Sequence, residues 1–218
     1  MKRVLLFALL LAASFSVFAQ SDETDSLSIQ AAIDACISMR DAVASGNREA
    51  IQRSADEFKA CNTSNFSSLR CKDDSVTSLN GHLVFDDAFA DSLAAGNDVY
   101  QQADDISRSA STRGQTADGS ILTKTCFVKA GGTTKYTFVA TGHQELAVVA
   151  EAGGLLTMRI HVKNSAGLDE RHDDTVDVKK GRPHRKVVFD MPRSPRSTVE
   201  LEVVNCGNKD TSFVVISN

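Results

Sequence analysis

A basic segment in the C-terminal half is the sequence's strongest candidate for binding chemistry. Seven lysines and arginines lie between Lys179 and Arg196, against one acidic residue, Asp190. Such a density of positive charge can attract phosphate, sulfate or carboxylate groups. The candidate binding residues are Lys179, Lys180, Arg182, His184, Arg185 and Lys186. The alternative is that these charges are solvated or pair with acidic residues of the N-terminal half.

An acidic cluster precedes this segment and suggests a metal site. Its members are Asp169, Glu170, His172, Asp173, Asp174 and Asp177. We expect them on a loop and the start of a strand, and oxygen-rich loops can hold Ca²⁺. Among them, Asp169, Asp173 and Asp174 are the candidate ligands. Because the spacing lacks the EF-hand pattern, a solvated acidic loop is the favoured interpretation, and no other cofactor is indicated.

Catalytic motifs are absent from the sequence. The five histidines form no His-Glu-x-x-His pair, and neither a Gly-x-Ser-x-Gly turn nor a phosphate-binding loop is present. Distant residues can still form a triad in space, so a hydrolase with its site between the two halves of the chain stays the alternative. The sequence favours a protein without catalytic activity. Nucleic acid is not an expected partner, because the net charge is −4 and stacking aromatics are not interleaved with the basic residues.

The five cysteines show no Cys-x-x-Cys spacing, which argues against a zinc site or a redox pair. Cys126 and Cys206 lie near the two ends of the strand-rich half, so we expect a disulfide between them. Three cysteines then remain, and one thiol is left over. It is either buried and free or part of an intermolecular bridge.

The first nineteen residues have the features of a signal peptide. Lys2 and Arg3 precede an apolar run over 4–18, and Ala19 supplies a small residue before Gln20. That run is shorter than the roughly 20 residues that a membrane span needs. The sequence therefore predicts cleavage after residue 19, a periplasmic or secreted protein, and no membrane span afterwards.

Charge and hydrophobic period divide the rest of the chain in two. Residues 20–118 hold 8 basic and 17 acidic residues, whereas 119–218 hold 14 and 11. A small, polar linker over 111–119 separates them. We expect a helical region over 20–118 and a second domain over 119–218.

The acidic half follows a helical period. Apolar residues recur at three- and four-residue steps, which predicts a helical hairpin over 28–61 with a break at 45–47 and Asn47 as the second cap. A third apolar stripe runs from Phe85 to Ile106. Before it, Asn80-Gly81 indicates a short β-hairpin near 76–85, or an extended lead-in to the helix.

The second half alternates at period two, between turns rich in glycine. This pattern predicts an antiparallel β-sandwich of about eight strands, and hence an α+β protein with an N-terminal helical hairpin or bundle. The expected strands are 121–129, 134–140, 146–151, 155–163, 175–178, 186–190, 199–204 and 212–216.

The strands also carry a resemblance to a known family. The runs 134–142 and 146–151, with 199–205, Gly207 and 212–216, resemble the early and closing strands of bacterial pre-peptidase C-terminal domains, which are jelly-roll-like sandwiches. The resemblance covers the C-terminal half and not the helical half. It implies a non-catalytic module of exported proteins that binds protein or polysaccharide surfaces. The expected protein is therefore an exported binding protein of the bacterial envelope or exterior, with an envelope protein or an anionic polysaccharide as partner.

Overall fold

The computed structural model describes residues 29–71, 82–96 and 121–218. The predicted signal peptide over 1–19 and the predicted linker over 111–119 lie outside these residues. The division into domains near residue 118 therefore stays a prediction.

The predicted helical hairpin is present. Helix α1 (Ile29–Ser45) and helix α2 (Arg48–Ala60) are joined by Gly46 and Asn47. Gly46 has a φ of 63°, a conformation that favours glycine, and so ends α1. The Asn47 side chain accepts hydrogen bonds from the amides of Glu49 (3.0 Å) and Ala50 (3.2 Å), and so caps α2.

A third helix, α3 (Asp87–Ala94), begins where the sequence places the third apolar stripe. Asp86 caps it by accepting a hydrogen bond from the Phe89 amide at 2.8 Å. Residues 82–86 form no strand and lead into α3, which agrees with the second of the two expectations for this segment. The Asn80-Gly81 turn and the stripe beyond residue 96 lie outside the described residues.

Two five-stranded sheets form the predicted sandwich, with the strand orders β1-β3-β10-β5-β8 and β2-β4-β9-β6-β7. All eight expected strands are present, and the N-terminal half adds two short ones, β1 and β2. The strands are β1 (Ser64–Asn65), β2 (Arg70–Cys71), β3 (Leu122–Val128), β4 (Thr133–Ala140), β5 (Gly142–Ala150), β6 (Leu155–Lys163), β7 (Asp169–Asp177), β8 (His184–Met191), β9 (Ser197–Asn205) and β10 (Thr211–Ser217).

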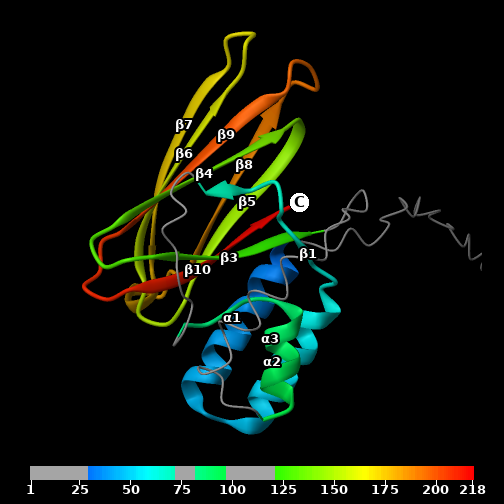
Figure 1. Cartoon of the computed structure of the whole chain (residues 1–218), viewed down its shortest axis with the longest axis vertical. Coiled ribbons are helices and arrows are strands. Elements are labelled where there is room, and N and C mark those ends of the chain that lie inside the picture. Colours follow the sequence, from blue (N-terminus) through cyan, green and yellow to red (C-terminus); the bar gives the residue numbers. More distant parts are fainter. Residues whose placement is uncertain (1–28, 72–81, 97–120) are drawn as a thin grey trace, which may run out of the picture.

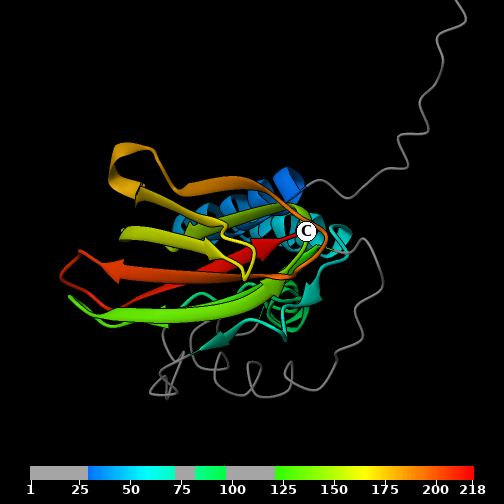
Figure 2. The ribbon, with the colours of Figure 1, turned by 90° about the horizontal axis from the view of Figure 1, so that it is seen from above.

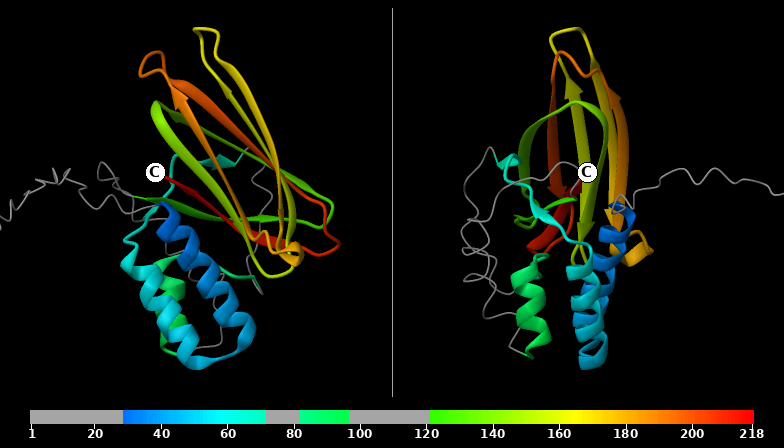
Figure 3. Two further views of the ribbon diagram at one scale, coloured as in Figure 1. Left: turned by 180° about the vertical axis from the view of Figure 1, so that it is seen from behind. Right: turned by 90° about the vertical axis from the view of Figure 1, so that its right-hand side faces the viewer.

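The helices form a third layer on the outer face of the first sheet. Figures 1 and 3 show them beneath β3, β5 and β10, while β6 and β7 extend away from them. The core beneath the helices contains Ala147 and Val149 of β5 with Val214 and Ile216 of β10. Viewed from above, the strands lie over the helices (Figure 2). The helical and strand-rich halves thus share buried apolar surface.

The second core lies between the two sheets. Leu146 and Val148 of β5 and Phe213 and Val215 of β10 belong to it, so these strands are buried on both faces. The Phe213 ring meets the Tyr136 ring edge-on, with 6.2 Å between their centres. The covered faces explain why 146–150 and 213–216 are unbroken apolar runs.

The predicted Cys126–Cys206 disulfide is wrong, because all five cysteines are free thiols. Cys126 lies in the middle of β3 and faces the interior between the sheets, where burial raises the pKa of its thiol to about 12. Cys206 is exposed beyond the end of β9, and its amide donates to the carbonyl of Leu155, the first residue of β6. The two cysteines therefore belong to different sheets and different environments.

Candidate functional site

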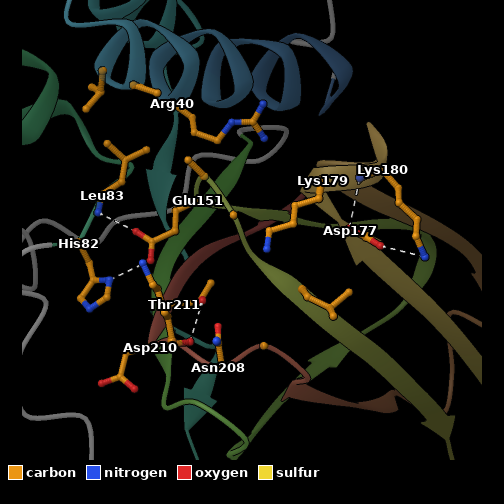
Figure 4. A pocket seen from close by; sticks show the side chains of 17 residues that line it. Arg40, His82, Leu83, Glu151, Asp177, Lys179, Lys180, Asn208, Asp210 and Thr211 are labelled. Atoms are coloured by element: carbon orange, nitrogen blue, oxygen red, sulfur yellow. Dashed lines mark hydrogen bonds and ion pairs between the residues drawn. The ribbon is translucent and has the colours of Figure 1, made fainter.

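A pocket of about 650 Å³ lies where α1 meets the end of the sandwich. Figure 4 shows its lining, which comes from segments far apart in the sequence. These are the second half of α1, residues 82–83, the β5–β6 turn, the 3-10 helix η1 (Val178–Lys180) and the β9–β10 turn.

Local packing holds the β5–β6 turn against β10. A side chain at Gly154 would lie 2.8 Å from Ala150 Cβ and 3.2 Å from Thr211 Cγ2. Glycine is therefore required at this close approach. The turn fixes the position of Glu151 at the floor of the pocket.

The carboxylates of the pocket already have partners. Glu151 accepts hydrogen bonds from the amides of Leu83 (3.3 Å) and Ser212 (2.8 Å) and from Ser212 Oγ (2.9 Å), and it lies 2.8 Å from His82 Nδ1. Asp177 accepts from the Lys180 amide at 3.3 Å. Asp210 accepts from the Ala130 amide at 2.9 Å. These acidic groups hold the turns together.

Three cations of the pocket retain free donors. The Arg40 side chain is 7% exposed, and its Nε and Nη2 donate to Asp41 at 2.9 and 2.7 Å. Its Nη1 is buried without a hydrogen-bond partner among the described residues. Lys179 and Lys209 are exposed lining residues, and neither forms an ion pair within the part of the chain that the structure describes. An unpaired buried donor costs roughly 1–3 kcal/mol, so Arg40 carries an unsatisfied group beside the pocket.

The basic segment predicted from the sequence does not form one surface. Lys179 points into the pocket, whereas Lys180 turns to Asp177, 3.4 Å from its Oδ2 (Figure 4). Arg182 is exposed between η1 and β8. The remaining three residues, His184, Arg185 and Lys186, belong to β8.

Pairing within the chain therefore accounts for part of this segment. Arg185 Nε lies 2.8 Å from Asp174 Oδ1, and Lys186 Nζ lies 3.1 Å from Glu145 Oε2. These acidic partners belong to the sandwich and not to the helical half, where the sequence alternative placed them. His184 is half-buried, and burial lowers the pKa of its imidazole.

Sequence reasoning missed Arg40 and Lys209. Arg40 occupies a position on the apolar stripe of α1, between Ile37 and Val43. An arginine on the buried face of a helix is a signal of special function or pairing. No comparable signal marks Lys209, which the fold brings to the pocket from the turn after β9.

The acidic cluster lies in strand β7, so the prediction that most of it forms a loop is wrong. Asp173 and Asp174 are neighbours on a strand and point to opposite faces, and four residues of strand, roughly 13 Å, separate Asp169 from Asp173. Asp169 pairs with His161 at 3.0 Å. Among the residues that the structure describes, no three metal-ligating side chains come together. The three predicted calcium ligands therefore do not converge.

Four of the five histidines, all but His184, lie beside carboxylates. His143 Nδ1 is 2.8 Å from Asp190, and His172 Nε2 is 3.8 Å from Glu170. Beside the pocket, the buried Ser212 hydroxyl lies 2.9 Å from the Leu83 carbonyl and 2.9 Å from Glu151, the carboxylate that pairs with His82. This serine contacts the carboxylate and not the imidazole, which is the reverse of a nucleophile–base arrangement.

Protonation of His82 is expected to stabilise the fold. Its hydrogen bond to Glu151, with a smaller contribution from Asp210, raises the pKa of the imidazole. The stabilisation is therefore fully present below the unfolded pKa of about 6.5 and is lost as the pH rises through the raised folded value. Urea unfolding of the wild type and of His82→Asn between pH 5.5 and 9 checks this. The difference in unfolding free energy should shrink as the pH rises, and a pH-independent difference would contradict the assignment.

Fold and site together define an α+β protein in which a β-sandwich and a helical layer enclose a cationic pocket. The helices within the described ranges are too short or too polar to span a bilayer. No protein-family model and no curated protein matches the sequence.

Solved structures match at the level of the sandwich. The chain is similar to the Yersinia pseudotuberculosis-derived mitogen, with 8% identity and a TM-score of 0.36 over 45% of this chain and 84% of the mitogen. It is similar to Aeromonas hydrophila PliG, a periplasmic inhibitor of g-type lysozyme, with 14% identity and a TM-score of 0.33 over 48% of this chain and 91% of PliG. It is also similar to TmCBM61, solved in complex with β-1,4-galactotriose, with 8% identity and a TM-score of 0.33 over 43% of this chain and 68% of TmCBM61. These similarities concern the fold alone.

Proposed function

We propose that this protein is exported to the periplasm or the exterior and binds an anionic polysaccharide there without catalysis. The observation that carries the proposal is the pocket itself. Its carboxylates Glu151, Asp177 and Asp210 are engaged within the chain. Among the described residues, Arg40 Nη1 has no hydrogen-bond partner, and Lys179 and Lys209 form no ion pair. Such a site attracts negative charge.

Two features of the sequence support this proposal. The predicted signal peptide over 1–19 directs the chain out of the cytoplasm. The resemblance of the strands to pre-peptidase C-terminal domains implies an accessory module that binds a protein or polysaccharide surface. An envelope protein with an acidic surface is the other partner that this chemistry admits, and the experiment below separates the two.

A charge-reversal experiment tests the proposal. Residues 20–218 are passed over immobilised heparin, polygalacturonate and neutral dextran at low and moderate salt. Lys179→Glu with Lys209→Glu should weaken retention on the anionic columns by about tenfold or more, because two favourable charges become repulsive. Raising the salt should weaken wild-type retention. Dextran should retain neither protein.

Arg193→Glu with Arg196→Glu is the matched control. Both arginines are exposed in the turn between β8 and β9, at the end of the sandwich far from the helices (Figure 1). The control changes the net charge by the same amount and should retain wild-type binding. Equal losses in both variants would assign retention to net charge, and no loss in the pocket variant would exclude this site. Capture of an envelope protein with no retention on either polymer would favour the protein partner.

A further inference from the structure

We infer that two copies of this chain associate through strand β8, whose open edge pairs with itself in antiparallel fashion about a two-fold axis. The surface consists of Lys186, Val188 and Asp190, and none of the three lines the pocket. The inference therefore goes beyond the proposed function and does not depend on it. It follows from the hydrogen-bond pattern, the apolar exposure and the order of charges along this strand.

The ladder between β5 and β8 determines which backbone groups of β8 are unused. In an antiparallel pair, directly opposite residues alternate between bonded and non-bonded pairs. The Ala150 amide donates to the Pro183 carbonyl opposite it at 3.1 Å, so this pair is bonded. Five residues along β5, the Glu145 amide donates to Asn218 Oδ1 at 2.8 Å and not to Val188 opposite it. That pair is non-bonded, as the alternation requires.

The backbone groups of Lys186, Val188 and Asp190 therefore point away from β5. Within the described ranges, no hydrogen bond uses them. All three residues are exposed, whereas His184 at the start of the strand is half-buried. The segment from 186 to 190 is thus open to a second strand, which can bond to every alternate residue.

The other three edges of the two sheets are less suited to this pairing. Strands β1 and β2 have two residues each. Strand β7 has nine residues, but five of them are acidic, so two copies of it would repel each other. Strand β8 is left as the long edge without such a barrier.

An exposed apolar side chain lies at the middle of this open segment. Val188 is 43% exposed, and Val139 is the other large apolar residue of the described chain that is exposed. Val139 lies on β4, an inner strand, whereas Val188 lies on an edge. Pairing about Val188 would place the two valines opposite each other and cover both from water.

The charges on either side of Val188 are self-complementary. Lys186 and Asp190 lie two residues before and after it, on the same face of the sheet. Antiparallel pairing centred on Val188 places Lys186 of each copy opposite Asp190 of the other. Within one copy, Lys186 Nζ lies 3.1 Å from Glu145 and Asp190 lies 2.8 Å from His143 Nδ1. The pairing thus extends rows of alternating charge across the axis, whereas a parallel arrangement would place like charges together.

The test measures self-association of residues 20–218 by analytical ultracentrifugation from low micromolar to near-millimolar concentration. The wild type should pass from monomer to dimer, and hydrogen exchange at the amides of Lys186, Val188 and Asp190 should slow as the dimer forms. Lys186→Asp and Asp190→Lys should each weaken dimerisation by about tenfold or more, because both pairs across the axis become repulsive. Mixed in equal amounts, the two variants should form a heterodimer within about threefold of wild-type affinity, because opposite charges face each other again.

Two further variants separate the edge from its charges. Lys163→Asp makes the same charge change on β6, which lies between β7 and β9, and should dimerise like the wild type. Val188→Pro removes the amide at the axis and should abolish dimerisation. Because this amide points away from β5, the proline removes no bond of the monomer's ladder.

A protein that stays monomeric at every concentration would overturn the inference. A dimer that neither the charge variants nor Val188→Pro weaken would also overturn it, because the interface would then lie elsewhere. Folded charge variants that fail to associate when mixed would exclude the antiparallel register. If Val188→Pro does not fold, the mixing experiment decides. Retention on anionic polymers is measured with the pocket variants, so the two proposals fail independently.

Discussion

Replacing Glu151 by alanine is expected to lower the free energy of unfolding by about 3–5 kcal/mol. The Glu151 side chain is 15% exposed and accepts from the amides of Leu83 and Ser212 and from Ser212 Oγ, besides pairing with His82. The variant leaves the two amides without this acceptor, whereas Ser212 Oγ can still donate to the Leu83 carbonyl. It also removes one of the contacts that hold the segment before α3 on the sandwich. Urea unfolding followed by circular dichroism at pH 7 measures the loss.

Glu202→Ala is the matched control for Glu151→Ala. Glu202 is also a carboxylate on a strand, but it pairs with Lys135 and Arg159 on the outer face of the second sheet. Ion pairs at such exposed positions contribute about 0–1 kcal/mol. Losses of similar size in the two variants would show that Glu151 has no special structural role.

A fragment of residues 119–218 is expected to aggregate instead of folding as a stable monomer. Without the helices, the outer face of the first sheet would expose Phe127, Ala147, Val149, Val214 and Ile216, which the full chain buries. A contiguous apolar face of this kind drives association. Size-exclusion chromatography and thermal unfolding of the fragment and of residues 20–218 make the comparison. A soluble fragment with cooperative unfolding would instead establish 119–218 as an independent domain.

Val149→Lys is the internal control of this experiment. It should destabilise residues 20–218 and make the fragment 119–218 more soluble. In the full chain, the lysine would lie between the helices and β5, where an unpaired charge costs about 3 kcal/mol or more. In the fragment, the same lysine faces water and should improve solubility. If the variant destabilised neither protein, the helices would not depend on this face.

Much of the fold could be predicted from the sequence, because its signals are local. Turn glycines and alternating apolar residues located all eight main strands, and the side chain of Asn47 located the start of α2. The unbroken apolar run over 146–150 carried further information. It marks a strand covered on both faces, and hence the place where the helices pack.

The errors concern features that local pattern does not encode. Strand β7 begins at Asp169, but its first residues are charged because β7 is at the edge of its sheet, so apolar alternation is absent there. The expected disulfide followed from position along the chain and not from the sheet to which each cysteine belongs. The pocket itself was not predicted, although the predicted basic segment supplies two of its lining residues, Lys179 and Lys180. Arg40 and Lys209 reach it from elements that only the tertiary fold brings together.

The ion pair between Arg185 and Asp174 has a consequence for behaviour at high concentration. It joins β8 to β7, and these strands form neighbouring open edges of the two sheets. Open edges can template the addition of a strand from another molecule, which is a route to fibrils. A second copy of β7, added parallel and in register, would place each acidic side chain opposite its own copy, and like charges directly opposite each other destabilise a strand pair. The acidic residues that first suggested a metal site therefore also oppose this mode of edge-to-edge polymerisation.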